Sequence, residues 1–129
     1  NLARHGDRIL FSAAVPGQGG HNHINERPLA YWRDLFEQHG YRAFDLVRPR
    51  VAADPAIDLW YRFNVLLYVH ERALAALPEA VQQTALAAGQ SIPSYAPWSW
   101  RLRCAVLRPL PVGLVTALAR LKNRVLRTS

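Results

Sequence analysis

Residues Arg8–Val15 form an apolar run, RILFSAAV, that lies between Gly6 and Pro16. Its length and its flanks predict a strand, and its lack of strict alternation predicts burial on both faces, as in a parallel sheet. A glycine-rich loop, PGQGGHNHINERP, follows the run, and a helical pattern follows the loop. A strand, a loop and a helix in this order predict one half of a βαβ unit.

The pattern after the loop predicts three more elements. Residues Pro28–Gly40 have helical periodicity, with Gly40 where a C-terminal cap belongs. The apolar face of this helix consists of Leu29, Trp32, Leu35 and Phe36. Tyr41–Val47 and Trp60–His70 are typical of strands, and the DPAID loop between them favours an antiparallel hairpin. We therefore predict an α/β fold with the order strand, helix, strand, strand and a closing antiparallel hairpin.

The charge divides the chain into two parts. Residues 1–72 carry nine arginines and eight acidic residues, whereas residues 73–129 carry seven basic residues and the single acid Glu79. We therefore predict an α/β part over 1–72 and a mostly helical, basic extension over 73–129. The single cysteine, Cys104, excludes an internal disulfide and fits a reducing compartment, so we expect a cytoplasmic protein.

The basic extension ends in a predicted amphipathic helix. Its apolar stripe consists of Leu114, Leu118, Leu121 and Val125. Residues 110–129 could lie on an anionic membrane surface, which would make the protein peripheral to the membrane, or pack on the sheet or on a second subunit. No run is long enough to span a bilayer, and no signal peptide opens the chain. We do not expect nucleic-acid binding, because the basic residues form neither long runs nor a known motif.

The loop itself is open to several interpretations. Its glycines could cradle a phosphate, although they match neither dinucleotide nor P-loop spacing. His21 and His23, with Glu26, could bind a metal. Alternatively, Asn25 or Glu26 caps the helix while the glycines make turns. A fourth interpretation depends on position, because ligands of open α/β sheets bind beyond the carboxyl ends of the parallel strands.

One ordered series of residues resembles a known family. It comprises LFSAAVPGQGGHNHINERPLAYWRDLFEQHGYRAFDLVRPRV and then LWYRFNVLLYV, with the patterns H-x-N-E, P-x-x-YW-x-x-LF-x-x-x-GY and WY-x-x-N. The series covers about residues 7–70 and is similar to the C-terminal half of a class I S-adenosylmethionine-dependent methyltransferase. The resemblance implies a Rossmann-like, seven-stranded sheet whose last strand is antiparallel and lies beside the fifth. Arg8–Val15 would be that fifth strand.

The resemblance also implies an activity and a set of site residues. Family members transfer a methyl group from S-adenosylmethionine to an O, N or C nucleophile, and we expect a small-molecule or sugar-like acceptor here. His23 is the expected catalytic residue, which would orient or deprotonate an acceptor hydroxyl. The other expected acceptor-binding residues are Gln18, His21, Asn25, Glu26 and Asn64. We expect no metal.

Four other side chains have structural interpretations. Trp60 and Tyr61 are expected to pack across the hairpin. Arg48 and Arg50 are expected to form a solvated surface pair.

The glycine-rich cofactor loop of the family and its ribose-binding acid have no counterpart in this sequence. We therefore interpret the chain, which lacks methionine, as a piece of a longer protein that binds S-adenosylmethionine weakly or not at all by itself. Two alternatives stay open: a non-catalytic α/β binding or regulatory module, and a membrane-surface protein that depends on its basic extension.

Overall fold

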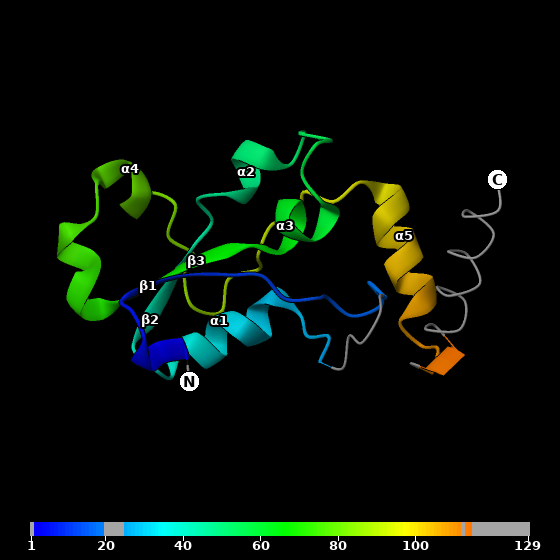
Figure 1. Cartoon of the computed structure of the whole chain (residues 1–129), viewed down its shortest axis with the longest axis horizontal. Coiled ribbons are helices and arrows are strands. Elements are labelled where there is room, and N and C mark those ends of the chain that lie inside the picture. The colour runs from blue at the N-terminus through cyan, green and yellow to red at the C-terminus, as the bar shows by residue number, and fades with distance from the viewer. Residues whose placement is uncertain (1, 20–24, 112, 115–129) are drawn as a thin grey trace. The chain divides into compact units, whose positions relative to one another are not determined.

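A computed structural model describes residues 2–19, 25–111 and 113–114 of the chain (Figure 1). Contacts within the chain separate two units. The first comprises residues 1–13 and 28–95, and the second comprises residues 14–27 and 96–129. The predicted boundary between residues 72 and 73 does not coincide with this division.

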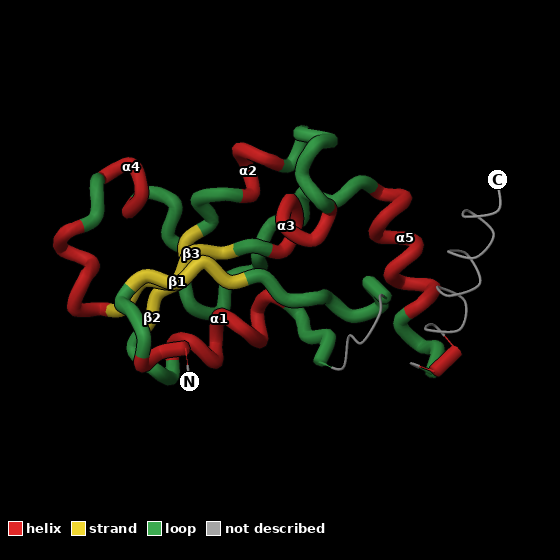
Figure 2. Tube along the Cα trace, viewed as in Figure 1, coloured by secondary structure: helices red, strands yellow, loops and turns green. Residues whose placement is uncertain are grey.

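The first unit is built on a three-stranded sheet, drawn yellow in Figure 2. Its strands are β1 (Arg8–Phe11), β2 (Tyr41–Phe44) and β3 (Leu66–His70), in the order β1-β3-β2. The central strand β3 is antiparallel to both neighbours, with Leu10 opposite Leu67 and Ala43 opposite Tyr68. As a result β1 and β2 run in the same direction. We call the end where β1 and β2 finish the exit end of the sheet, and the end where they begin the entry end.

The helix α1 (Leu29–Glu37) connects β1 to β2, as the periodicity predicted. It begins directly after Pro28, and Gly40 follows its end with a φ of 77°, a conformation that favours glycine. Its buried Phe36 stacks on Tyr68 of β3 with ring centroids 3.9 Å apart. The core around this contact also includes Tyr41, Ala43 and Leu66.

The remaining helices are short, apart from α5. They are the 3-10 helices η1 (Leu2–Arg4) and η2 (Glu71–Ala76), and the α-helices α2 (Arg48–Val51), α3 (Leu59–Asn64), α4 (Glu79–Gln82) and α5 (Trp98–Leu107). The chain therefore has a mixed α/β fold, and the predicted order of strand, helix, strand, strand is present with α2 and α3 inserted before the last strand. Within the described ranges, no helix combines the length and the apolar character needed to cross a bilayer.

Two predictions about the strands are wrong in part. The strand predicted over Arg8–Val15 ends at Phe11, and it is an edge strand of an antiparallel sheet in which Leu10 is 64% exposed. It is therefore not buried on both faces. The first half of the strand predicted over Trp60–His70 is the helix α3, since helical spacing buries both Phe63 and Asn64, which a strand would direct to opposite faces.

In its described part, the extension over residues 73–129 is less helical than predicted. The α4 helix begins after Pro78 and ends at Gln82. Beyond it, the carbonyl of Thr84 accepts from the N–H of Asp45, and the N–H of Leu86 donates to Ala43 along the outer edge of β2. These bonds to a strand prevent the helix from continuing. The predicted helix around Leu114, Leu118, Leu121 and Val125 lies outside the described residues except for Leu114.

Candidate functional site

The glycine-rich loop of the second unit closes on the carboxylate of Glu26. Gly17 and Gly19 have φ values of 77° and 67°, so the predicted turns are present. Their N–H groups donate to Oε2 and Oε1 of Glu26, both at 2.9 Å. Backbone N–H groups that converge in a turn form an anion-binding concavity, which we call the nest, and here the Glu26 carboxylate of the same loop occupies it. The phosphate interpretation of the loop therefore has no free donors at these two glycines.

The predicted helix caps are absent from this loop. The residue before α1 is Pro28, which has no side-chain cap, whereas the Glu26 oxygens accept from the glycines. Asn25 Oδ1 instead accepts from Arg27 Nε at 3.2 Å, and Asn25 is exposed. The helix α1 can begin without a side-chain cap because the φ angle of Pro28 is already fixed near the value that a helix start requires. Asn25 therefore stays available for an acceptor contact, whereas Glu26 is part of the loop's internal frame.

Gln18, which was expected to bind the acceptor, is buried rather than exposed. Its side chain is 2% exposed, and its Oε1 accepts from the N–H of Val15 at 3.2 Å. The Gln18 N–H donates to the Val15 carbonyl at 3.0 Å, so the two residues close a tight turn. A buried amide held in this way stabilises the loop and has little access to a ligand.

The loop lies against the helix α5 within the same unit. A Cβ atom on Gly17 would stand 2.1 Å from the carbonyl oxygen of Cys104, so only glycine fits there. Burial raises the pKa of the Cys104 thiol, while Arg103 acts in the opposite direction and Glu26 adds to the increase. A thiol with a raised pKa is a poor nucleophile at neutral pH.

The two loop histidines, His21 and His23, lie outside the described residues. The assignment of His23 as a base is therefore still a prediction from the sequence. Within the ranges that the structure covers, no three His, Cys, Asp or Glu side chains gather as a metal site would require.

The exit end of the sheet holds a buried ion pair. Arg48 Nε and Nη2 donate to the two carboxylate oxygens of Asp45 at 2.8 and 2.7 Å. Arg48 Nη1 donates to the carbonyls of Phe63 and Pro93 at 3.2 and 3.1 Å. The Arg48 side chain is 1% exposed, so the predicted surface pair with Arg50 is wrong for Arg48, although Arg50 is exposed. The sequence signal that could have predicted this ion pair is the spacing of three residues between Asp45 and Arg48.

Aromatic and polar side chains surround this end of the sheet. Asn64 is 3% exposed at the end of α3, and Val65 separates it from β3. Ser12 Oγ donates to the Trp60 carbonyl at 3.0 Å and so fixes α3 to the segment after β1. Trp60 and Tyr61 are 44% and 53% exposed, so the prediction that they pack across the hairpin is wrong. For Tyr61 the helix explains this, because residues two positions apart, such as Tyr61 and Phe63, lie on opposite sides of a helix.

A second buried arginine, Arg33, was not identified from the sequence. Its Nη1 donates to the carbonyls of Ala87 and Gln90 at 3.3 and 2.5 Å and holds that segment against α1. A signal was present, because Arg33 lies four residues after Leu29 and three before Phe36 on the apolar face. Burial raises the pKa of the nearby Tyr68 hydroxyl, against the opposing effect of Arg48 and Arg33.

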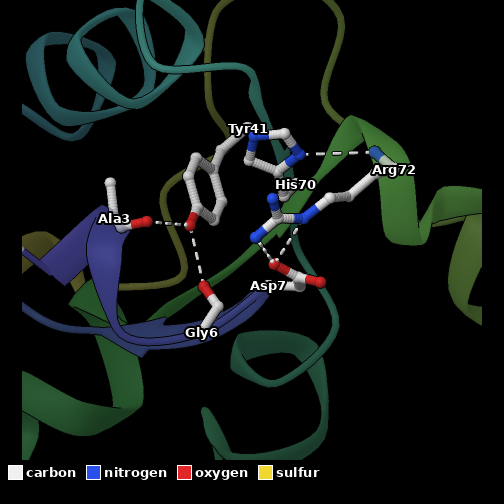
Figure 3. A network of polar contacts seen from close by, with 6 residues as sticks. All are labelled: Ala3, Gly6, Asp7, Tyr41, His70 and Arg72. Atoms are coloured by element: carbon white, nitrogen blue, oxygen red, sulfur yellow. Dashed lines mark hydrogen bonds and ion pairs between the residues drawn. The ribbon is translucent and has the colours of Figure 1, made fainter.

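The entry end of the sheet is organised by Tyr41, as Figure 3 shows. The Tyr41 hydroxyl lies 2.7 Å from the Gly6 carbonyl oxygen and 3.0 Å from that of Ala3, so it fixes the segment before β1. Beside it, the exposed Arg72 binds Asp7, with Nε to Oδ1 at 2.8 Å. The hydrogen bond from Arg72 is the main reason that the pKa of Asp7 is lowered. This network joins three strand ends and has a structural role.

Comparisons of the chain with protein-family models, with curated proteins and with solved structures find no match. A functional assignment therefore depends on the pattern of the sequence and on the geometry described above.

Proposed function

We propose that this chain is the acceptor-side portion of a class I S-adenosylmethionine-dependent methyltransferase that acts on a small-molecule or sugar-like acceptor. One observation carries the proposal. The last strand, β3, is antiparallel to β1 and lies between β1 and β2, although β2 precedes it in the chain. The family resemblance implies an antiparallel last strand beside the strand that corresponds to β1.

The strand order agrees with the order that the resemblance implies, and it is an observation separate from the sequence motifs on which the resemblance depends. A simple meander would have the order β1-β2-β3, with each strand next to its neighbour in the chain. Here α1 instead connects two strands that run in the same direction and leaves a gap that β3 fills. Such a crossover through a helix is a feature of α/β sheets rather than of antiparallel meanders.

The same geometry supports an acceptor site at the exit end. In open α/β sheets, ligands bind beyond the carboxyl ends of the parallel strands. β1 and β2 both finish at the exit end, where Ser12 Oγ, just after β1, donates to the Trp60 carbonyl. Trp60 and Tyr61 add exposed rings near the same end, whereas Asn64 is 3% exposed and has little access to an acceptor. Exposed aromatic rings are suited to the apolar faces of a sugar-like acceptor.

The described residues do not fit the cofactor. The family's glycine-rich cofactor loop has no counterpart in the sequence, and the N–H groups of Gly17 and Gly19, in a different loop, already donate to Glu26. We therefore assign S-adenosylmethionine binding to residues outside this chain. When bound, the cofactor supplies an electrophilic methyl group. The residues of this chain would orient the acceptor, and His23 would accept the proton of an acceptor hydroxyl as a general base.

The test uses the product of the complete gene that encodes this chain. We expect calorimetry to detect S-adenosylmethionine binding, and we expect labelled methyl groups to appear on hydroxylated acceptors in a panel that includes sugars. His23→Ala should lower kcat/KM by about 10²–10⁴. The matched control is His39→Ala, which removes an exposed histidine just after α1.

Three results would contradict the proposal in different ways. A complete gene product that binds no S-adenosylmethionine would favour a non-catalytic α/β binding module. A His23→Ala variant with full turnover would remove the proposed base. Micromolar binding of the cofactor to the 129-residue chain alone would overturn the assignment of the cofactor site to residues outside it.

A further inference from the structure

The helix α5 has two apolar faces, of which its own unit covers one. Trp100, Cys104 and Leu107 are half-buried, and Cys104 lies against the glycine-rich loop. The opposite face carries Trp98, Leu102 and Val106, which are 75%, 55% and 59% exposed. Spacings of four residues place these three side chains in one stripe. A helix of a water-exposed surface normally has a polar outer face, so this stripe requires a partner.

The charges beside the stripe indicate the chemistry of that partner. With 100° per residue, Arg101 and Arg108 lie along one side of the stripe and Arg103 lies along the other. Residues 80–129 contain seven Lys and Arg residues and no Asp or Glu. An apolar stripe flanked by three exposed arginines is complementary to a surface that is negatively charged outside and apolar beneath.

We propose that α5 binds an anionic lipid surface through Trp98, Leu102 and Val106, with the flanking arginines at the phosphate groups. Aliphatic side chains in such a helix enter the boundary between headgroups and acyl chains. Tryptophan is enriched at that boundary, and arginine stems can lie along the apolar surface while their guanidinium groups stay in water. The arginines on both sides of the stripe favour lipid over a protein partner, whose acidic residues would have to match both rows.

The experiment measures flotation of the complete 129-residue chain with lipid vesicles. We expect binding to phosphatidylglycerol-containing vesicles, little binding to pure phosphatidylcholine vesicles, and a loss of binding at high salt. Leu102→Gln with Val106→Gln should weaken binding about tenfold, because two aliphatic side chains no longer enter the lipid. Both positions are exposed, so the fold should tolerate the change. The matched control is Leu10→Gln on β1, where an equally exposed leucine lies on another element.

A second variant tests the charges. Arg101→Gln with Arg108→Gln should weaken binding about fivefold for each arginine removed, and only to anionic vesicles. Unchanged vesicle binding in the Leu102→Gln, Val106→Gln variant would overturn the proposal, since residues after α5 would then suffice. A chain that ignores vesicles but forms dimers that the same variant separates would also overturn it, in favour of a second copy as the partner.

Discussion

The two ends of the sheet can be compared through the arginine–aspartate pair that each of them holds. At the exit end, the side chains of Arg48 and Asp45 are 1% and 8% exposed. At the entry end, those of Arg72 and Asp7 are 66% and 39% exposed. Both arginines bind the aspartate through Nε and Nη2, but Arg48 uses both carboxylate oxygens of Asp45 and Arg72 uses only Oδ1 of Asp7, so the pairs differ in geometry as well as in access to water.

This difference in burial determines what each pair requires from its surroundings. A buried ion pair is tolerated only when further hydrogen bonds replace the lost water, and the carbonyls of Phe63 and Pro93 do this for Arg48. The exposed pair keeps most of its water and is screened by salt. The exit end is consequently fixed by its ion pair, whereas the entry end depends on Tyr41.

The largest effect is expected from breaking the buried pair. Arg48→Met leaves the Asp45 carboxylate buried without its partner and should lower the free energy of unfolding by about 3–5 kcal/mol. Urea denaturation measures this, with Arg50→Met as the control at an exposed arginine nearby. If the single variant does not fold, Asp45→Asn combined with Arg48→Met should recover part of the loss. Equal free energies of unfolding for the Arg48 and Arg50 variants would contradict the stabilising role assigned to the buried ion pair at the exit end.

An intermediate effect is expected at Glu26, whose half-buried carboxylate binds backbone amides. Glu26→Gln replaces one acceptor oxygen by an amide group that cannot accept, and should destabilise the loop by about 1–3 kcal/mol. Amide hydrogen exchange measured by NMR should become faster at Gly17 and Gly19. Glu71→Gln, at an exposed glutamate, should leave both rates unchanged. Unaltered exchange rates at Gly17 and Gly19 in the Glu26 variant would contradict the hydrogen bonds assigned to the Glu26 carboxylate.

A smaller effect is expected from Tyr41→Phe at the entry end. The ring contacts with Phe36 and His70 stay, while the hydrogen bonds to the segment before β1 are lost. We expect a loss of about 1 kcal/mol in urea denaturation. Tyr61→Phe, which changes an exposed ring, is the control and should have almost no effect. A larger effect at Tyr61 than at Tyr41 would contradict the role assigned to the Tyr41 hydroxyl.

The smallest effect is expected at the exposed pair. Because the pKa of Asp7 is lowered from 3.8 in the folded chain, the pair contributes fully above that value and its contribution is lost as the pH falls through the lower folded pKa. Asp7→Asn should therefore reduce stability only slightly at neutral pH and flatten its acid dependence. A double-mutant cycle with Arg72→Gln, at low and high salt, measures the coupling. A coupling that high salt leaves unchanged would contradict the exposed character of this pair.

Much of the fold follows from local patterns in the sequence. The helix α1 was predicted from one apolar face and a terminal glycine, because these signals do not depend on distant residues. The prediction of a strand at α3 is wrong because a short aromatic run is compatible with either a helix or a strand. In the structure the helix buries Phe63 and Asn64 together, which the local pattern does not reveal. The prediction of a mostly helical segment after residue 73 is wrong in part for a related reason. The backbone of residues 84–86 forms hydrogen bonds with residues 43–45 instead of continuing the helix α4.

The candidate site was less predictable than the fold. Glu26 was recognised as a polar loop residue, but its bonds to Gly17 and Gly19 span nine and seven residues and depend on two left-handed turns. Gln18 and Arg48 have polar side chains that are normally exposed, and only their tertiary partners explain their burial. His23 and His21 stay predictions, as does the assignment of the methyl acceptor.

The sheet also has two unlike borders. Along β2, residues 84–86 already pair with the outer edge through the Phe44–Ala85 bridge. In the part of the chain that the structure describes, no strand pairs with the outer edge of β1. A strand that joins this sheet, from a longer polypeptide or from another molecule, is therefore expected to dock beside β1, because residues 84–86 already occupy the Ala43–Asp45 end of the β2 edge.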